Sequence, residues 1–178
     1  MNATSAILTA QALSLIAFGM FAFWYVVPWL RARTRAEALT SLIWVHMFRN
    51  LALQLYSAQQ AGFAISDGAR DHNVIGDVAG MLLALVTLIS LRYRGRFSTV
   101  LVWLLIVETF WDIGTGMPEA IASHTLGQVS GVTWLILAYY VPLMIICLVL
   151  TIWQLMSRGR EPMDRGGPAA DLRVRAGA

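Results

Sequence analysis

Apolar residues along this chain gather in five long runs, and polar residues cluster in the short segments between them. Each run is long enough to cross the hydrocarbon core of a bilayer as a helix, which takes about 20 predominantly apolar residues. The pattern therefore predicts an all-α fold, namely a five-span transmembrane helical bundle. The predicted spans cover residues 6–30, 38–61, 74–91, 97–117 and 130–156.

Prolines and loop-forming residues indicate where these helices should end or bend. Pro28 is expected to loosen the last turn of the first span, because proline has no N–H to donate. Pro118, with glycines two and four residues before it, is expected to end the fourth span. Pro142, preceded by two tyrosines, predicts a kink in the fifth span. The polar segment 62–73 is expected to form a loop.

Small residues recur at intervals of four in the third span, at Gly76, Gly80 and Ala84. At this spacing they lie on one side of a helix and form a ridge without bulky side chains. Such a ridge predicts that a neighbouring helix approaches the third span closely.

Composition agrees with a membrane protein and excludes an ordinary soluble domain. Of the 178 residues, 58% are hydrophobic and 13% are charged, and the mean hydropathy is +0.64. The net charge of +3 does not indicate nucleic acid, because every basic residue is an arginine and most lie just beyond the ends of apolar runs. We therefore expect a lipid bilayer, and no nucleic acid, as a partner. The single cysteine, Cys147, excludes an intramolecular disulfide and a cysteine-based metal site.

Arginines are distributed unequally between the two sides of the predicted membrane. Three follow the first span, three follow the third and five lie after residue 156, whereas Arg70 alone lies on the other side. Because cytoplasmic segments carry an excess of basic residues, the N-terminus is predicted outside and the C-terminus in the cytoplasm. The arginines nearest the first apolar run follow it, whereas a signal peptide carries its basic residues before the apolar segment. We therefore expect a retained span and not a signal peptide. Residues 157–178 are predicted to be a disordered tail.

The chain has 13 arginines and no lysine, and this usage indicates a GC-rich genome. A bacterial source follows from this as a hypothesis. We therefore expect a multi-pass protein of the bacterial cytoplasmic membrane.

Four polar residues interrupt the second span. His46, Asn50 and Gln54 follow one another at intervals of four, and Arg49 lies beside them, so an α-helix would place all four on one side. A charged side chain at membrane depth is costly and normally turns inward to a partner. This stretch therefore predicts a buried polar site.

Acidic residues in the third and fourth spans are the expected partners of this stretch. Asp77 lies in the third span, whereas Glu108 and Asp112 lie one turn apart in the fourth, with Trp111 beside them. At a rise of about 1.5 Å per residue, Arg49 and Glu108 should both lie near the midplane. We expect Arg49 to be the counter-ion of Glu108 or Asp112, because an unpaired buried charge is severely destabilising.

One arginine against three acids leaves the predicted site with an excess of negative charge. At least one carboxylate should therefore take up a proton or face water. His46 is the group in this site that we expect to titrate nearest neutral pH. The predicted buried polar site, for transport or binding, comprises His46, Arg49, Asn50, Gln54, Asp77, Glu108, Trp111 and Asp112.

Three short elements of the sequence resemble a group of uncharacterised small multi-span bacterial membrane proteins. They are His46-x-Phe48-Arg49, Gly76-Asp77 and Trp111-Asp112-Ile113-Gly114, and they cover the second to fourth spans. The resemblance implies a multi-pass membrane protein and no particular activity.

Three function classes remain open at this point. The first is proton- or ion-coupled transport of a small solute. The second is a membrane-embedded enzyme acting on a lipid or isoprenoid-like substrate, with Glu108 or Asp112 as general acid and Arg49 or His46 stabilising developing charge. The third is a non-catalytic subunit with a membrane-complex partner; a homo-oligomer is also open. We predict no cofactor and no metal, because His72 and His124 fall in predicted loops and leave His46 without a partner for haem.

Overall fold

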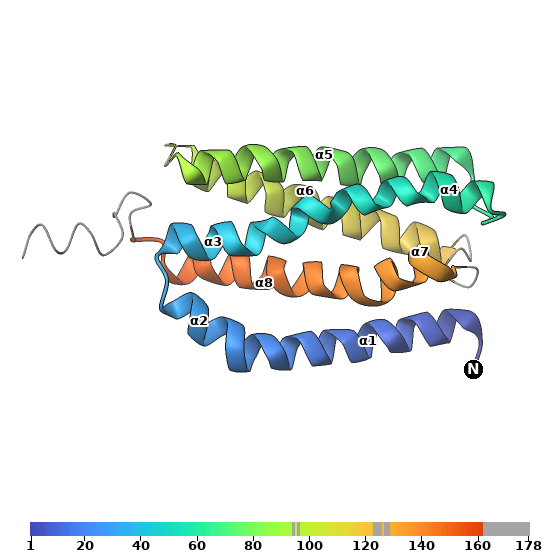
Figure 1. Cartoon of the computed structure of the whole chain (residues 1–178), viewed down its shortest axis with the longest axis horizontal. Helices are drawn as coiled ribbons and strands as arrows, with labels where there is room; N and C mark the ends of the chain where they lie inside the picture. Colours follow the sequence, from blue (N-terminus) through green and yellow to red (C-terminus); the bar gives the residue numbers. More distant parts are fainter. Residues whose placement is uncertain (94, 96, 123–125, 127–128, 162–178) are drawn as a thin grey trace, which may run out of the picture.

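The computed structural model describes residues 1–93, 95, 97–122, 126 and 129–161. Within these residues every regular element is a helix, and the helices run along one common axis (Figure 1). The predicted all-α fold is therefore confirmed. The predicted tail, residues 157–178, is described only to residue 161. In this part Ser157 ends the helix α8 (Val141–Ser157) and Arg158 pairs with Glu161, so the first residues of the tail are ordered, contrary to the prediction. Residues 162–178, His124, Arg94 and Arg96 lie outside the described residues.

In the part of the chain that the structure describes, four helical rods are long and apolar enough to cross a membrane. Large apolar side chains such as Phe23, Ile75 and Val107 are exposed along them, as they are in proteins that face lipid. These features indicate a membrane protein. The rods are α1 (Ala3–Phe21) continued by η1 (Ala22–Val26) and α2 (Val27–Arg31); α5 (Asp67–Arg92); α6 (Ser98–Ala122), of which Ser98–Pro118 is the candidate span; and α7 (Gly131–Leu135) continued by η4 (Ile136–Tyr140) and α8 (Val141–Ser157).

The predicted second span is not one regular α-helix. It consists of α3 (Arg35–Ile43), the 3₁₀ helix η2 (Trp44–Leu53) and α4 (Gln54–Gln60). Thr34 starts α3 with a capping box, in which its hydroxyl accepts from the Glu37 N–H and the Glu37 carboxylate accepts from the Thr34 N–H. This segment, which carries His46, Arg49, Asn50 and Gln54, is not among the four candidate spans found in the described residues, although it runs the length of the bundle beside α5 (Figure 1).

Two of the three prolines in the long rods, Pro28 and Pro142, follow a short π-helical stretch, whereas Pro118 lies within the α-helix α6. Pro28 comes after η1, and Pro142 comes after η4. A proline removes one backbone donor and crowds the carbonyl four residues earlier. A π turn widens the helix at this point, so the rods continue through the proline and bend there.

Two predicted helix ends are wrong. The loop expected over residues 62–73 ends at Ser66, because the Ser66 hydroxyl accepts from the Ala69 N–H and starts α5 at Asp67. His72 therefore lies on a helix and not in a loop. Pro118 does not end the predicted fourth span, since α6 continues through it to Ala122.

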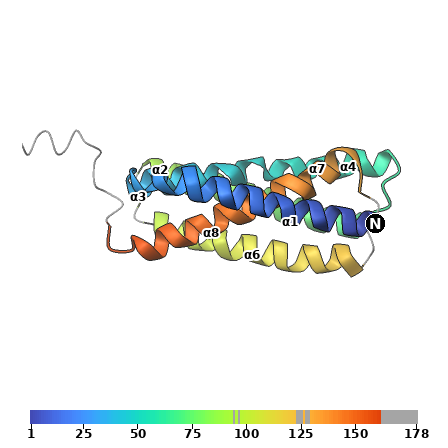
Figure 2. The same ribbon diagram turned by 90° about the horizontal axis from the view of Figure 1, so that it is seen from below.

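The layers of the bundle separate the polar site from the first rod. Figure 1 shows α1 on one side of α3 and α8, and the α5–α6 pair on the other side. Seen from below, α1 runs over α8, against which it packs (Figure 2). An aliphatic core between α3, α5, α6 and α8 fills the end of the bundle that carries the ends of α2, α5 and α8. The buried residues of this core include Leu39, Ile43, Leu88, Leu105 and Leu148.

Candidate functional site

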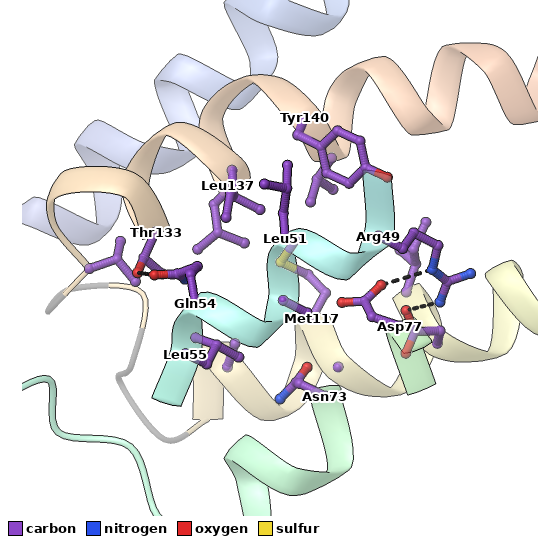
Figure 3. Close-up of a pocket in the computed structure, with 18 of the residues that line it drawn as sticks. Arg49, Leu51, Gln54, Leu55, Asn73, Asp77, Met117, Thr133, Leu137 and Tyr140 are labelled. Atoms are coloured by element: carbon purple, nitrogen blue, oxygen red, sulfur yellow. Dashed lines mark hydrogen bonds and ion pairs between the residues drawn. The ribbon is translucent and has the colours of Figure 1, made fainter. Parts of the chain in front are cut away.

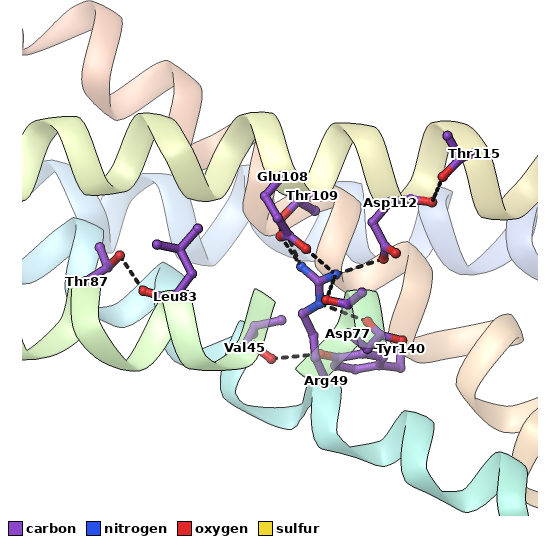
Figure 4. Close-up of polar contacts among 11 residues, drawn as sticks. Val45, Arg49, Asp77, Leu83, Thr87, Glu108, Thr109, Asp112, Thr115 and Tyr140 are labelled. Atoms are coloured by element: carbon purple, nitrogen blue, oxygen red, sulfur yellow. Dashed lines mark hydrogen bonds and ion pairs between the residues drawn. The ribbon is translucent and has the colours of Figure 1, made fainter. Parts of the chain in front are cut away.

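A single arginine holds three acidic side chains between η2, α5 and α6 (Figure 4). The Arg49 side chain is fully buried. Its Nε donates to Asp77 Oδ1 at 2.8 Å, its Nη1 to Glu108 Oε2 at 2.6 Å and its Nη2 to Asp112 Oδ2 at 2.8 Å. The sequence predicted Arg49 as the counter-ion of Glu108 or Asp112, and the structure brings Asp77 to the same guanidinium.

The remaining donors of Arg49 are also bonded inside the protein. Nη2 donates to Glu108 Oε1 at 3.0 Å, so Glu108 accepts from both terminal nitrogens. Nη1 also donates to Thr109 Oγ1 at 3.3 Å, and Nη2 reaches the Gly76 carbonyl at 3.4 Å. A guanidinium has five N–H donors, and every nitrogen that carries them is bonded here. Arg49 is therefore fixed in position and has no donor left for a ligand.

Glycines of α5 provide the room for this cluster. A Cβ atom added to Gly80 would overlap the guanidinium of Arg49. One added to Gly76 would lie 2.6 Å from Asp112 Oδ1. The ridge that the sequence predicted as a surface for close helix packing therefore accommodates a buried ionic cluster from two neighbouring elements.

The 3₁₀ geometry of η2 decides which of its side chains face inward. With three residues per turn, residues three apart lie above one another. His46, Arg49 and Ala52 are accordingly the buried residues of η2, whereas Asn50 is exposed. The sequence prediction that Asn50 shares the buried face is thus corrected, because it assumed the α-helical step of four.

Two other predicted site residues lie apart from the ion pairs. His46 is 2% exposed, and its Nδ1 has no hydrogen-bond partner in the described part of the chain. Trp111 is 72% exposed on the outer face of α6, so the structure does not bring it into the cluster. Its neighbour Asp112 faces inward, because consecutive helical residues point about 100° apart.

A cavity of about 160 Å³ opens next to the ionic cluster (Figure 3). Arg49, Asp77 and Asp112 line one end of it. The Asp77 and Asp112 side chains are 25% and 20% exposed, so each carboxylate is partly open to this space. The walls are mostly apolar and include Leu51, Leu55, Met117, Ile136, Leu137 and Met144.

A hydrogen-bonded pair lies at the other end of the cavity. Gln54 Nε2 donates to Thr133 Oγ1 at 2.9 Å, and the Thr133 hydroxyl lies 3.2 Å from Gln54 Oε1 (Figure 3). A groove of about 400 Å³ between α4 and α7 is lined by Gln54, Thr133 and Phe63 as well, so it adjoins the cavity across these side chains. The predicted site residue Gln54 is therefore in the site, but at its outer edge.

Several residues of the site were not predicted from the sequence. Thr109 bonds to the guanidinium, and Asn73, Thr133 and Tyr140 line the cavity. Thr133 and Tyr140 are rare polar groups in the most apolar run of the chain, and this signal could have identified them. For Asn73 the signal was hidden, because the residue was assigned to a loop.

Tyr140, the last residue of η4, is bonded to the 3₁₀ helix η2, and its loss should weaken the fold. Its hydroxyl donates to the Val45 carbonyl at 2.9 Å (Figure 4). We expect Tyr140→Phe to lower the free energy of unfolding by about 1 kcal/mol, since hydrogen bonds between membrane helices contribute about 0.6 to 1.7 kcal/mol. The neighbouring Tyr139 is 48% exposed, so Tyr139→Phe is the matched control and should have no effect. Denaturant titration in detergent micelles, followed by circular dichroism, measures both; equal effects would contradict the assignment.

The site offers negative charge to the cavity without an obvious metal position. Among the described residues, no group of three or more His, Cys, Asp or Glu side chains is arranged to hold a metal ion. Three carboxylates surround one guanidinium, so the cluster carries two excess negative charges when all are ionised. In a low-dielectric interior this excess favours uptake of a proton or another cation.

Comparison with known proteins identifies a family for this chain. The model of a family described as a domain of unknown function, DUF8737, matches residues 6–156, which include every residue of the cluster and the cavity. No curated protein and no solved structure matches the chain.

Proposed function

The chain belongs to the family DUF8737, a domain of unknown function, and from the geometry of its site we propose that it transports a small solute across the membrane, coupled to protons or cations. The solute enters the cavity beside Arg49. Its movement is coupled to charge at Asp77 and Asp112, the two carboxylates of the cluster that line this space. We further propose the bacterial cytoplasmic membrane as the location.

The proposed topology has five crossings, with the N-terminus outside and the C-terminus in the cytoplasm. The segment α3–η2–α4 is the fifth crossing. With 16 α-helical and ten 3₁₀ residues it measures roughly 44 Å, more than the ~30 Å of a hydrocarbon core. Arginines at the ends of α2, α5 and α8, which gather at one end of the bundle (Figure 1), support a cytoplasmic assignment of that end.

One observation carries the proposal: the cavity ends at two carboxylates of a cluster that holds three acids and one base. A carboxylate that is fully neutralised by its own cation binds a proton or a second cation weakly. In this cluster three carboxylates share one guanidinium, and the two carboxylates that line the cavity are partly exposed. Coulomb attraction therefore links the entry of a solute into the cavity to the neutralisation of these two carboxylates.

Proton and cation flux in proteoliposomes tests the proposal. Purified protein is reconstituted with a pH-sensitive or a cation-sensitive dye inside the vesicles, and flux is recorded under pH, cation and voltage gradients. The wild type should exceed empty vesicles, and Asp112→Asn should reduce the flux at least tenfold. Asp112 is chosen because Arg49 Nη2, its partner, keeps a second bond to Glu108 and the fold should survive.

Asp67→Asn is the matched control, because its side chain is 79% exposed at the start of α5. It should leave the flux unchanged. No flux above empty vesicles under any gradient would end the transport proposal, and so would equal flux from wild type and Asp112→Asn.

A subunit that assembles with a membrane partner is the second candidate. The observation that favours it is the saturation of Arg49, whose nitrogens are all bonded within the chain, as in a purely structural clamp. In that case Asp112→Asn should lower stability or complex yield, and the wild type should show no flux. The enzyme hypothesis gains no comparable support. Asp112 and Arg49 line the cavity, but the nitrogens of Arg49 are all bonded within the chain and have no donor left to stabilise developing charge, and Glu108 and His46 do not line the cavity.

A further inference from the structure

The cavity has a charged end, an apolar body and an uncharged polar end, and these three features together specify a ligand. We infer that the solute is a small organic ammonium ion whose apolar part is about the size of one benzene ring. Its ammonium group binds between Asp77 and Asp112, and its apolar part fills the space toward Gln54 and Thr133. This inference rests on the proposed function and names its substrate class.

The charge of the ligand follows from the hydrogen-bond donors and acceptors at the charged end of the cavity. An anion would need N–H or O–H donors, yet the nitrogens of Arg49 are all directed at acceptors of the protein. Asp77 Oδ1 and Asp112 Oδ2 accept from Arg49. The second oxygen of each carboxylate accepts no hydrogen bond from the described residues. Both carboxylates are partly exposed to the cavity, so an ammonium group, with three donors and one positive charge, complements them.

The excess negative charge of the cluster strengthens this preference. One positive charge reduces the formal excess from two to one. In a medium of low dielectric constant an interaction between charges a few ångströms apart is far stronger than in water. A neutral molecule of the same shape gains nothing from this interaction, so the cavity should discriminate by charge.

The size of the ligand follows from the volume and the walls. A cavity of about 160 Å³ is close to the roughly 150 Å³ that accommodates a benzene molecule in an apolar protein interior. Besides the polar side chains already named, its walls are mostly aliphatic and thioether side chains, among them Leu51, Met117, Leu137 and Met144 (Figure 3). They favour an apolar body and provide no partner for further charged groups.

The route into the cavity is also indicated by shared residues. Gln54, Phe63 and Thr133 line both the cavity and the larger groove between α4 and α7. The groove carries polar side chains such as Ser57 and Ser130, so it can hold a hydrated cation before the solute sheds its water. The solute therefore passes the Gln54–Thr133 pair on its way to the carboxylates.

Calorimetric titration of the full chain in nanodiscs tests the inference. The probes are benzylammonium chloride, benzyl alcohol and sodium phenylacetate, which share a ring and differ in charge. Benzylammonium should bind saturably and at least tenfold more tightly than the alcohol, and phenylacetate should not bind. Methylammonium and tetraphenylphosphonium, which underfill and exceed the cavity, should each bind at least tenfold more weakly than benzylammonium.

Two variants locate the binding in the cavity. Leu137→Trp fills the space without changing a charge and should abolish binding of benzylammonium. Leu135→Trp, two residues away with a 52% exposed side chain, is the matched control and should bind normally. Thermal unfolding of both variants confirms that they are folded. If Leu137→Trp is not folded, Asp112→Asn replaces it, with an expected loss in affinity of at least tenfold.

The outcomes separate this inference from the proposed function. Equal affinity for alcohol and amine, a preference for phenylacetate, undiminished binding by folded Leu137→Trp, or no saturable binding would each overturn the inferred substrate class. Proton flux that persists without binding of benzylammonium would overturn this class and leave coupled transport standing. Binding of benzylammonium without flux in proteoliposomes would support the ligand site and overturn the proposed transport.

Discussion

Arg49→Met is expected to lower the free energy of unfolding by about 3–5 kcal/mol, because it leaves buried acids without their cation. Methionine fills much the same volume, so the loss is one of charge and hydrogen bonds. Asp77, Glu108 and Asp112 would then repel one another at the place where Arg49 now lies between them. Equilibrium unfolding in mixed detergent micelles, followed by circular dichroism, measures the change.

Two further variants make this result specific. Arg70→Met removes an arginine that pairs with the exposed Asp67 and Asp71 outside the cluster, and should change stability by less than about 1 kcal/mol. Neutralising the acids together with Arg49, as Asp77→Asn, Glu108→Gln and Asp112→Asn, should restore part of the loss, since no unpaired charge remains. An Arg49→Met protein as stable as wild type would show that the cluster does not hold the helices together.

Gly80→Ala is the second change with a large expected effect. The new methyl group would occupy the space of the Arg49 guanidinium, and the surrounding ion pairs prevent the guanidinium from moving aside. We expect a loss of about 3 kcal/mol, at the upper end of the range for overpacked cores. The thermal midpoint and the denaturant midpoint in micelles should both fall.

Other glycines of the bundle provide a graded comparison. Gly114 has no atom within 4 Å of an added Cβ, so Gly114→Ala should be neutral or stabilise the helix by up to about 1 kcal/mol. The loss of stability for Gly76→Ala should lie between those for Gly80→Ala and Gly114→Ala, because the added methyl group meets only one side-chain oxygen, Asp112 Oδ1, at 2.6 Å. If Gly80→Ala and Gly114→Ala behaved alike, the packing of Arg49 against α5 would be contradicted.

The composition of the site could be predicted from the sequence in part. Arg49, Asp77, Glu108 and Asp112 were identifiable because ionisable groups in apolar runs are costly and require partners. That they lie at similar positions along the bundle was expected from the helical rise. Asn50 was assigned wrongly, since the 3₁₀ helix η2 replaces the step of four by a step of three and turns this side chain outward.

The predicted helix ends were least accurate where local signals compete. Pro118 is a strong signal to stop, yet α6 continues through it, because one missing donor does not end a helix whose other bonds remain. The segment before Asn73 looks like a loop by composition, yet the Ser66 cap makes most of it the first turns of α5. As a result Asn73 was placed in a loop and missed as a residue of the cavity.

The sequence by itself determined the class of protein, the apolar rods and the imbalance of three acids against one arginine. These properties depend on composition and on spacing along the chain, which hydrophobicity and helical geometry convert directly into structure. Only the tertiary structure decided that Asp77 joins the same guanidinium, that Gly80 makes room for it and that a cavity opens beside two of the carboxylates. Such features depend on the rotation of each helix about its axis, and that rotation is set by the packing of residues distant in sequence.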